Sequence, residues 1–168
     1  MNLLSPRRIW LGMALASAGL AVASVVLTIL LHLHPCYMCI FQRLMFMLLV
    51  PLTLVAALAG SRGIRLSAGI LSLLTAAAGG GVAGYQIWIQ AQPNAMFSCT
   101  GTETPSFIEH LVSWLGDQVP TLFLADGNCG DKALVILGLS LAAWSFVTFS
   151  CFLLAGLWAV IDGARRTP

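Results

Sequence analysis

Residues 34–43 read HPCYMCIFQR and hold the side chains with the clearest capacity for chemistry. Cys36 and Cys39 are separated by two residues, and Arg43 follows Cys39 by four positions, so a helix here would place Arg43 on the same face one turn further along. A disulfide that closes so short a loop constrains the unfolded chain very little, and such cysteine pairs are more typical of redox chemistry or of metal binding. The thiolate is the reacting form in both cases, and a helix N-terminus and a nearby cation stabilise it.

Two further cysteines, Cys99 and Cys129, lie in a polar segment over residues 90–132. Three interpretations of the four cysteines are open: inert disulfides that brace this segment, a zinc site, and a redox relay. The histidines available to a zinc site are His32, His34 and His110. Such a site would lack its second half, because Cys99 and Cys129 are 30 positions apart and neither has another ligand close by in the sequence. The short spacing of the first pair and the arginine beside it favour the relay.

The rest of the chain is mostly apolar, and it must position these side chains in a membrane. Of its 168 residues 59% are hydrophobic and 8% are charged, whereas a soluble domain is about 25% charged. The apolar segments, each of about 20 residues or more and therefore long enough to cross a bilayer as a helix, cover approximately residues 9–31, 40–59, 66–89 and 133–161. We expect an all-α membrane protein, a four-helix transmembrane bundle forming a single domain over residues 1–168. A net charge of +2 without a basic run excludes a nucleic-acid-binding protein.

The basic residues predict how the bundle is oriented. The arginines at the ends of the apolar segments are Arg7, Arg8, Arg62, Arg65, Arg165 and Arg166. By the positive-inside rule both termini are cytoplasmic, and the first cysteine pair and residues 90–132 face the exported side. The first apolar run is longer than the about 7–15 residues of a signal peptide, so we expect it to be a transmembrane helix.

A short amphipathic helix is expected within the exported loop. Its apolar positions are Phe107, Ile108, Leu111, Val112 and Leu115, and its expected ends are Ser106 and Gly116. We favour a helix that lies flat on the bilayer surface. The alternative is that it packs on the bundle.

The cysteine pattern resembles that of a known family. Residues 35–43 (PCYMCIFQR), residues 119–129 (VPTLFLADGNC) and the position of Cys99 resemble disulfide bond formation protein B, the DsbB family. The resemblance covers essentially the whole chain. It implies a quinone-dependent oxidoreductase of the bacterial inner membrane that generates disulfides. Such an enzyme reoxidises a periplasmic DsbA-like thiol oxidant and passes the electrons to ubiquinone or menaquinone.

The resemblance also implies roles for individual residues. Cys99 would form the mixed disulfide with the partner, Cys129 would resolve it and then exchange with Cys36, and Cys39 would face the quinone as a thiolate in a charge-transfer complex. Arg43 would stabilise this thiolate. The implied resting disulfides are Cys36–Cys39 and Cys99–Cys129, with Cys36–Cys129 in transit.

One position departs from the family pattern. Well-studied relatives carry a histidine near the quinone on the third helix, and Gln86 falls there in this chain. Glutamine can hydrogen-bond a quinone oxygen but cannot gain a proton, so protons would come from water or elsewhere. The resemblance implies no metal cofactor. The alternative function is a metal-binding or structural membrane protein with a disulfide-braced loop, in which Cys151, inside the last apolar segment, would be a packing residue.

Overall fold

Four long helices dominate the structure, a computed structural model that describes residues 5–92, 104–127, 129–130 and 134–165. The elements in chain order are α1 (Pro6–Leu30), α2 (Tyr37–Leu58), α3 (Arg62–Gln90), α4 (Ser106–Gln118), α5 (Pro120–Phe123), β1 (Val135–Ile136), β2 (Leu139–Ser140) and α6 (Leu141–Arg165). Helices α1, α2, α3 and α6 are each long and apolar enough to cross a membrane. The prediction of an all-α, four-helix membrane bundle is confirmed.

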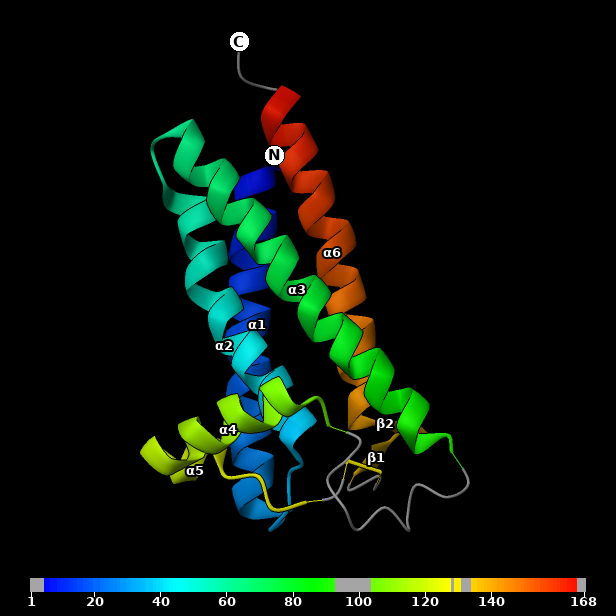
Figure 1. The fold of residues 1–168 in the computed structure, drawn as a ribbon. Helices are drawn as coiled ribbons and strands as arrows, with labels where there is room; N and C mark the ends of the chain where they lie inside the picture. Colours follow the sequence, from blue (N-terminus) through cyan, green and yellow to red (C-terminus); the bar gives the residue numbers. More distant parts are fainter. Residues whose placement is uncertain (1–4, 93–103, 128, 131–133, 166–168) are drawn as a thin grey trace.

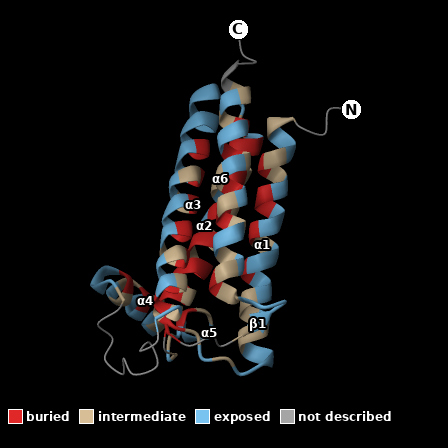
Figure 2. Ribbon diagram, turned by 90° about the vertical axis from the view of Figure 1, so that its right-hand side faces the viewer, coloured by how far each residue is buried: buried red, intermediate tan, exposed pale blue. Residues whose placement is uncertain are grey.

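The four long helices lie side by side, and the short elements gather at one end of them (Figure 1). Helix α1 begins, and α6 ends, at the opposite end, where α2 also turns into α3. Helix α2 is the most enclosed, with 50% of its apolar span buried against 22% for α1 and α6. Its buried residues and those of the other long helices lie toward the axis of the bundle (Figure 2). Residues at the start of α2 are therefore held by contacts on several sides.

An aromatic stack fixes the middle of the bundle. The ring of Phe46 on α2 stacks on Phe149 of α6 at a centroid distance of 4.3 Å, and Phe152 meets Phe46 edge-on at 6.4 Å. Gly79 of α3 faces Phe149 so closely that a Cβ there would collide with the ring. Only glycine lets α3 and α6 approach at this level.

The fourth apolar segment does not begin as a helix. Helix α6 starts at Leu141, whereas the sequence predicted a continuous helix from Ala133, and β1 and β2 instead pair as an antiparallel hairpin. Leu137 and Gly138 form its two-residue turn with φ angles of 53° and 81°, the positive values of a type I′ turn. Trp144 donates a hydrogen bond of 3.0 Å to the Ile136 carbonyl and fastens the hairpin to α6.

Helix α4 is amphipathic, as predicted, and it packs on the end of α2. Ile108 and Val112 are buried in the same apolar core as the bundle. Packing on the bundle was the alternative prediction, whereas a flat position on the bilayer surface was the favoured one. On the outer face Phe107 and Trp114 are 69% and 60% exposed. Contact of that outer face with lipid stays a prediction.

Candidate functional site

Cys36 and Cys39 lie at the start of α2, where the helix geometry brings their sulfurs together. Cys36 is the N-cap residue, and its Sγ accepts a hydrogen bond of 3.4 Å from the Cys39 backbone N–H. The two Sγ atoms are 3.0 Å apart and hydrogen-bonded as thiols. A disulfide between them needs the sulfurs to approach to about 2.05 Å, so oxidation requires only a small local movement. Helix dipole and N–H groups both favour negative charge on these sulfurs.

Cys129 reaches the pair from the loop, because the chain just before it is fastened to the turn that precedes α2. The backbone N–H groups of Asp126 and Gly127 both donate to the Pro35 carbonyl at 3.1 Å. Gly127 lies so close to the His34 carbonyl that any Cβ would overlap it. The clamp consists of these contacts between residues 34–35 and 126–127. A hydrogen bond of 2.7 Å between His34 Nδ1 and Asp126 Oδ2 adds to it.

The clamp places Cys129 against Cys36 in a small buried cluster. Cys36 is 2% exposed and Cys129 is 7% exposed, and both pack with Met38 and Ile89. The hydrogen bond between these two sulfurs raises the pKa of Cys36, as do its bond with Cys39 and its burial. The same bond from Cys36 lowers the pKa of Cys129 against the opposing effect of burial. Of this pair, Cys129 is the sulfur prepared to act as a thiolate.

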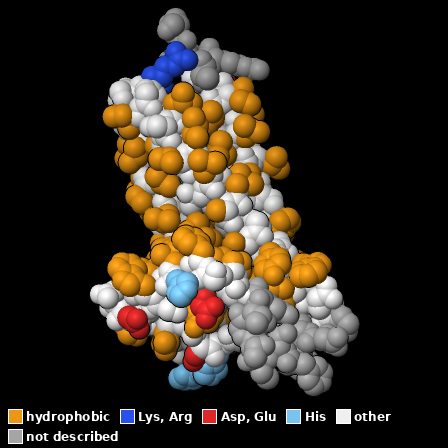
Figure 3. Space-filling view, viewed as in Figure 1, with side chains coloured by type: hydrophobic (Ala, Val, Ile, Leu, Met, Phe, Trp, Pro, Cys, Tyr) orange, Lys and Arg blue, Asp and Glu red, His pale blue; other side chains and the backbone are white. Residues whose placement is uncertain are grey.

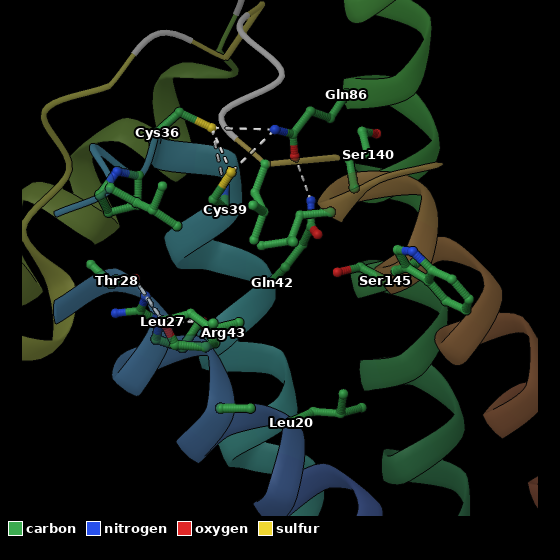
Figure 4. A pocket seen from close by; sticks show the side chains of 18 of the residues that line it. Leu20, Leu27, Thr28, Cys36, Cys39, Gln42, Arg43, Gln86, Ser140 and Ser145 are labelled. Atoms are coloured by element: carbon green, nitrogen blue, oxygen red, sulfur yellow. Dashed lines mark hydrogen bonds between the residues drawn. The ribbon is translucent and has the colours of Figure 1, made fainter. Parts of the chain in front are cut away.

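Gln86 of α3 donates to both sulfurs of the CxxC pair. Its Nε2 lies 3.4 Å from Cys36 Sγ and 3.2 Å from Cys39 Sγ. Its Oε1 accepts a hydrogen bond of 2.7 Å from Gln42 Nε2. Figure 4 shows this chain of contacts from Gln42 through Gln86 to the two cysteines. Gln86 thus belongs to the site, with its amide donors directed at sulfur.

Arg43 lies one turn below Cys39 on the same face of α2 and is only 4% exposed. Its Nε donates to Ser24 Oγ at 2.9 Å, its Nη2 to Thr28 Oγ1 at 2.6 Å and to the Ser24 carbonyl at 3.3 Å. Its Nη1 donates to the Leu122 carbonyl at 2.7 Å. The guanidinium therefore ties α1, α2 and α5 together. The family resemblance implied the Cys39 thiolate as the partner of Arg43, and these oxygens of the protein itself were not predicted.

A cavity of about 320 Å³ connects these groups. At one end it is polar, with Cys39, Gln42, Arg43 and Gln86 in its wall. Its other walls are mostly apolar and come from α1, α2, the β1–β2 hairpin and α6; they include Leu20, Leu27, Phe46, Leu141 and Trp144. The sulfur of Cys39 thus borders a largely apolar space.

The residues that form this cavity fit a quinone. A quinone has a flat apolar ring with two carbonyl oxygens, so its site needs apolar walls and a hydrogen-bond donor at one end. The Nη1 atom of Arg43 carries a second N–H that the described residues leave available. The cavity also adjoins Cys39, so a ring held there would lie beside the sulfur.

The structure brings together most of the residues singled out from the sequence: Cys36, Cys39, Arg43, Gln86 and Cys129. Cys99 lies outside the described residues. Cys151 is exposed on α6, and it lines neither this cavity nor the sulfur cluster among the described residues.

Sequence reasoning missed Gln42, Ser24 and Thr28, which hold Gln86 and Arg43 in place. A signal was present, because polar side chains inside apolar segments are rare and usually have partners there. Ser24 and Thr28 are four positions apart on one face of α1. Their partner, Arg43, lies 15 or more residues further along the chain, so the spacing of the two side chains did not predict the contact.

A metal site is not apparent in the described part of the chain. No group of three or more His, Cys, Asp or Glu side chains there has the arrangement of a ligand set. His32 and His34 lie at the turn before α2, and His110 is exposed on α4. The zinc interpretation therefore gains no ligand set from the described residues.

Comparison with known proteins agrees with the cysteine pattern. Residues 6–159 match the family model described as disulfide bond formation protein DsbB. A protein of Dechloromonas aromatica called disulfide bond formation protein B is 41% identical over 151 residues, covering 86% of this chain and 87% of that protein. A protein of the same name from Aromatoleum aromaticum is 38% identical over 165 residues, covering 96% and 95%. A third, from Xanthomonas campestris pv. campestris, is 36% identical over 154 residues, covering 90% and 87%. With this similarity along nearly its full length, the chain belongs to the DsbB family of membrane proteins that form disulfide bonds.

Proposed function

We propose that this oxidoreductase reoxidises a DsbA-like periplasmic thiol oxidant and delivers the electrons to a membrane quinone. The observation that carries the proposal is the position of Cys39. Its sulfur adjoins both the Cys36–Cys129 cluster and the cavity that contains Arg43. One side of the CxxC pair thus faces the loop that a soluble partner would meet, and the other faces the space where a lipid-soluble acceptor would bind.

The thiol exchange follows from the sulfur positions. A reduced partner attacks a Cys99–Cys129 disulfide at Cys99, which releases Cys129 as a thiolate. The Cys129 thiolate then attacks Cys36 of a Cys36–Cys39 disulfide, so the Cys36–Cys129 bond forms and Cys39 leaves as a thiolate. When Cys36 is in a disulfide it has no S–H to donate, and the Met38 backbone and the Thr104 side chain are then the groups whose hydrogen bonds lower the pKa of the attacking Cys129. The leaving Cys39 sulfur accepts a hydrogen bond from Gln86.

At the cavity, the protein would position the electron acceptor and stabilise the charge beside it. A bound quinone would supply the oxidant, taking up two electrons and two protons as a disulfide replaces two thiols. Arg43 would place its positive charge beside the Cys39 thiolate and direct its second Nη1 N–H toward a carbonyl oxygen. Gln86 would stabilise sulfur rather than the quinone, because its amide groups are already used. The chemistry accommodates either ubiquinone or menaquinone.

The proposal also assigns a location and an orientation. Described arginines Arg7, Arg62 and Arg65 lie at the end of the bundle opposite the cysteines. By the positive-inside rule that end faces the cytoplasm. The protein would then span the bacterial inner membrane with both termini cytoplasmic and Cys36, Cys39, Cys99 and Cys129 on the periplasmic side.

Quinone reduction by the purified full-length protein tests the proposal. Reduced DsbA-like protein would be added with ubiquinone or menaquinone in detergent, and the quinone absorbance followed. Wild type and Cys151→Ala should turn over, whereas Cys39→Ala and Cys99→Ser should not. No turnover with either quinone by folded protein would contradict the proposal. Stoichiometric zinc that is lost with Cys36→Ser would favour the metal-binding alternative.

A further inference from the structure

A second cavity, also about 320 Å³ in volume, lies at the end of the bundle far from the cysteines. It is enclosed by the start of α1, the end of α2, the start of α3 and the end of α6. Nothing in the disulfide chemistry uses it. Its wall includes Arg7, Trp10, Arg62, Arg65, Leu66 and Gly163.

The charges around the cavity favour an anionic ligand. Three of the described residues that line it are arginines, and none of them is acidic. Asp162 is the one described acidic residue at this end, whereas Arg7, Arg8, Arg62 and Arg65 all lie there. The basic side chains gather on this end of the molecule and are separated from the acidic ones at the other end (Figure 3).

The helix dipoles add little to this positive charge, because two helix N-termini and two C-termini surround the cavity. Helices α1 and α3 begin here and α2 and α6 end here, so the positive ends of two dipoles are opposed by the negative ends of the other two and the arginines supply the positive charge. Ser61 caps α3 by accepting a hydrogen bond from the Ile64 N–H. Ser5, at the N-cap position of α1, makes no such side-chain bond and lines the cavity.

The inner wall of the cavity is apolar, and this favours an anion that carries apolar groups over a small hydrated one. Trp10 is only 5% exposed, and Ala56, Ala57 and Ala159 are also buried. Leu66 lines the cavity and is 42% exposed on the outside of α3. A small hydrated anion would make no use of this wall, whereas a phospholipid offers a phosphate for the guanidinium groups and acyl chains for the apolar surface.

We infer that this cavity binds the head group of an anionic phospholipid, with its phosphate against Arg7, Arg62 and Arg65. The site lies where the ends of spanning helices meet the head-group layer, and the lipid enters from the side of α3. The inference does not depend on the quinone or on the thiol partner. Phosphatidylglycerol is the probe that represents this ligand class.

Lipid binding to the purified full-length protein tests the site. Retained phosphatidylglycerol would be counted by native mass spectrometry in competition with phosphatidylcholine, with and without inorganic phosphate. We expect phosphatidylglycerol to be preferred by about tenfold or more, since each basic residue near an anionic head group contributes about a factor of five. Inorganic phosphate should not displace it. Equal retention of both lipids, or displacement by phosphate alone, would overturn the inference.

Two matched pairs of variants separate a site from general electrostatic attraction. Gly163 lines the cavity and a Cβ there meets nothing within 4 Å, so Gly163→Leu adds an apolar side chain at the wall without removing charge. Gly63 is equally open but does not line the cavity, so Gly63→Leu is its control. Arg65→Gln removes a lining charge, and Arg8→Gln removes one at the same end outside the wall.

The two cavity variants should lower the preference for phosphatidylglycerol about fivefold or more, and their controls should leave it unchanged. A loss in the controls as large as in the cavity variants would overturn the inference. So would retention of the full preference by Gly163→Leu in protein whose melting temperature is unaltered.

Discussion

Gln42 on α2 donates a hydrogen bond of 2.7 Å to the Oε1 atom of Gln86 on α3. This contact decides the orientation of the Gln86 amide, because with Oε1 occupied the Nε2 donors must face Cys36 and Cys39. Both glutamines are buried, at 4% and 1% exposure, so water offers little competition. A neutral amide pair thus donates to the sulfurs at the position where the family pattern described above has a histidine.

Replacing Gln86 with leucine should slow electron transfer from Cys39. A hydrogen bond to a charged group contributes about 1.5–3 kcal/mol, so loss of the Nε2 donor should lower the rate by about tenfold or more. Single-turnover oxidation of the reduced protein by quinone would measure it. Gln42→Leu should have a smaller effect, because the Nε2 donor of Gln86 remains and only the hydrogen bond that orients the Gln86 amide is lost. Equal rates in wild type and Gln86→Leu would contradict this role.

Gln86→His should add a pH-dependent step that the wild type lacks. Glutamine does not titrate, whereas an ordinary histidine has a pKa of about 6.5. The turnover of Gln86→His should therefore show a step as the pH passes through the histidine pKa, in addition to the titration of the cysteine thiols that both proteins share. Quinone reduction between about pH 5.5 and 8, the range around this value, would reveal the difference. The same step in both proteins would show that another group near the cavity titrates.

Arg43→Lys should impair both the bundle and the reaction. A lysine ammonium has three donors and cannot reproduce the planar arrangement that reaches Ser24, Thr28 and Leu122. We expect turnover to fall by about tenfold and the free energy of unfolding by about 1–3 kcal/mol. Thr28→Val removes one of these bonds and keeps the shape, so it should cost only about 1 kcal/mol. Thermal unfolding in detergent and quinone turnover would be compared for the three proteins.

Gly127→Ala should slow exchange between Cys129 and Cys36 without removing a sulfur. The added Cβ overlaps the His34 carbonyl, so the loop must move away from Pro35 and carry Cys129 with it. Trapping the Cys36–Cys129 disulfide by rapid acid quench would give the rate. Gly63→Ala, in open space at the other end of the bundle, serves as the control. Unchanged trapping in Gly127→Ala would show that the clamp does not position Cys129.

The Cys129 thiolate should form at a lower pH than an ordinary thiolate. Its pKa is lowered chiefly by the hydrogen bond from Cys36, so alkylation of Cys129 should reach half its maximal rate below the usual value of about 8.5. In reduced protein that keeps only Cys36 and Cys129, Cys36→Ala should raise this midpoint. Cys36→Ser retains a donor and should raise it less. If the alkylation midpoint of Cys129 is the same with and without Cys36→Ala, the hydrogen bond from Cys36 is not what lowers the Cys129 pKa.

Hydropathy was sufficient to predict the membrane helices, because length and apolar composition alone determine whether a segment can span a bilayer. It failed at the start of α6. The residues of the hairpin are as apolar as a helix, and the turn places Leu137, rather than asparagine or glycine, at a positive φ angle. Gly138 is the one turn signal in this stretch, and a single glycine inside an apolar run does not by itself predict a turn.

Only those parts of the candidate site that depend on local sequence spacing were predictable. The spacing of Cys36, Cys39 and Arg43 on one helix is local, so their shared face could be read directly. The pairing of Gln42 with Gln86 joins residues 44 positions apart, and it depends on how α2 and α3 pack. Such contacts follow from tertiary structure and have no counterpart in a single stretch of sequence.

The clamp on the Pro35 carbonyl has a kinetic consequence. Because the chain is fastened at Asp126 and Gly127, Cys129 is tethered only a few residues from its target. Its reaction with Cys36 is thus intramolecular, with an effective concentration set by this short tether, and linkers of this length give values in the millimolar range or above. Small thiols in solution must exceed that concentration to compete. The clamp would therefore protect the relay from leakage to other thiols as well as speed its internal step.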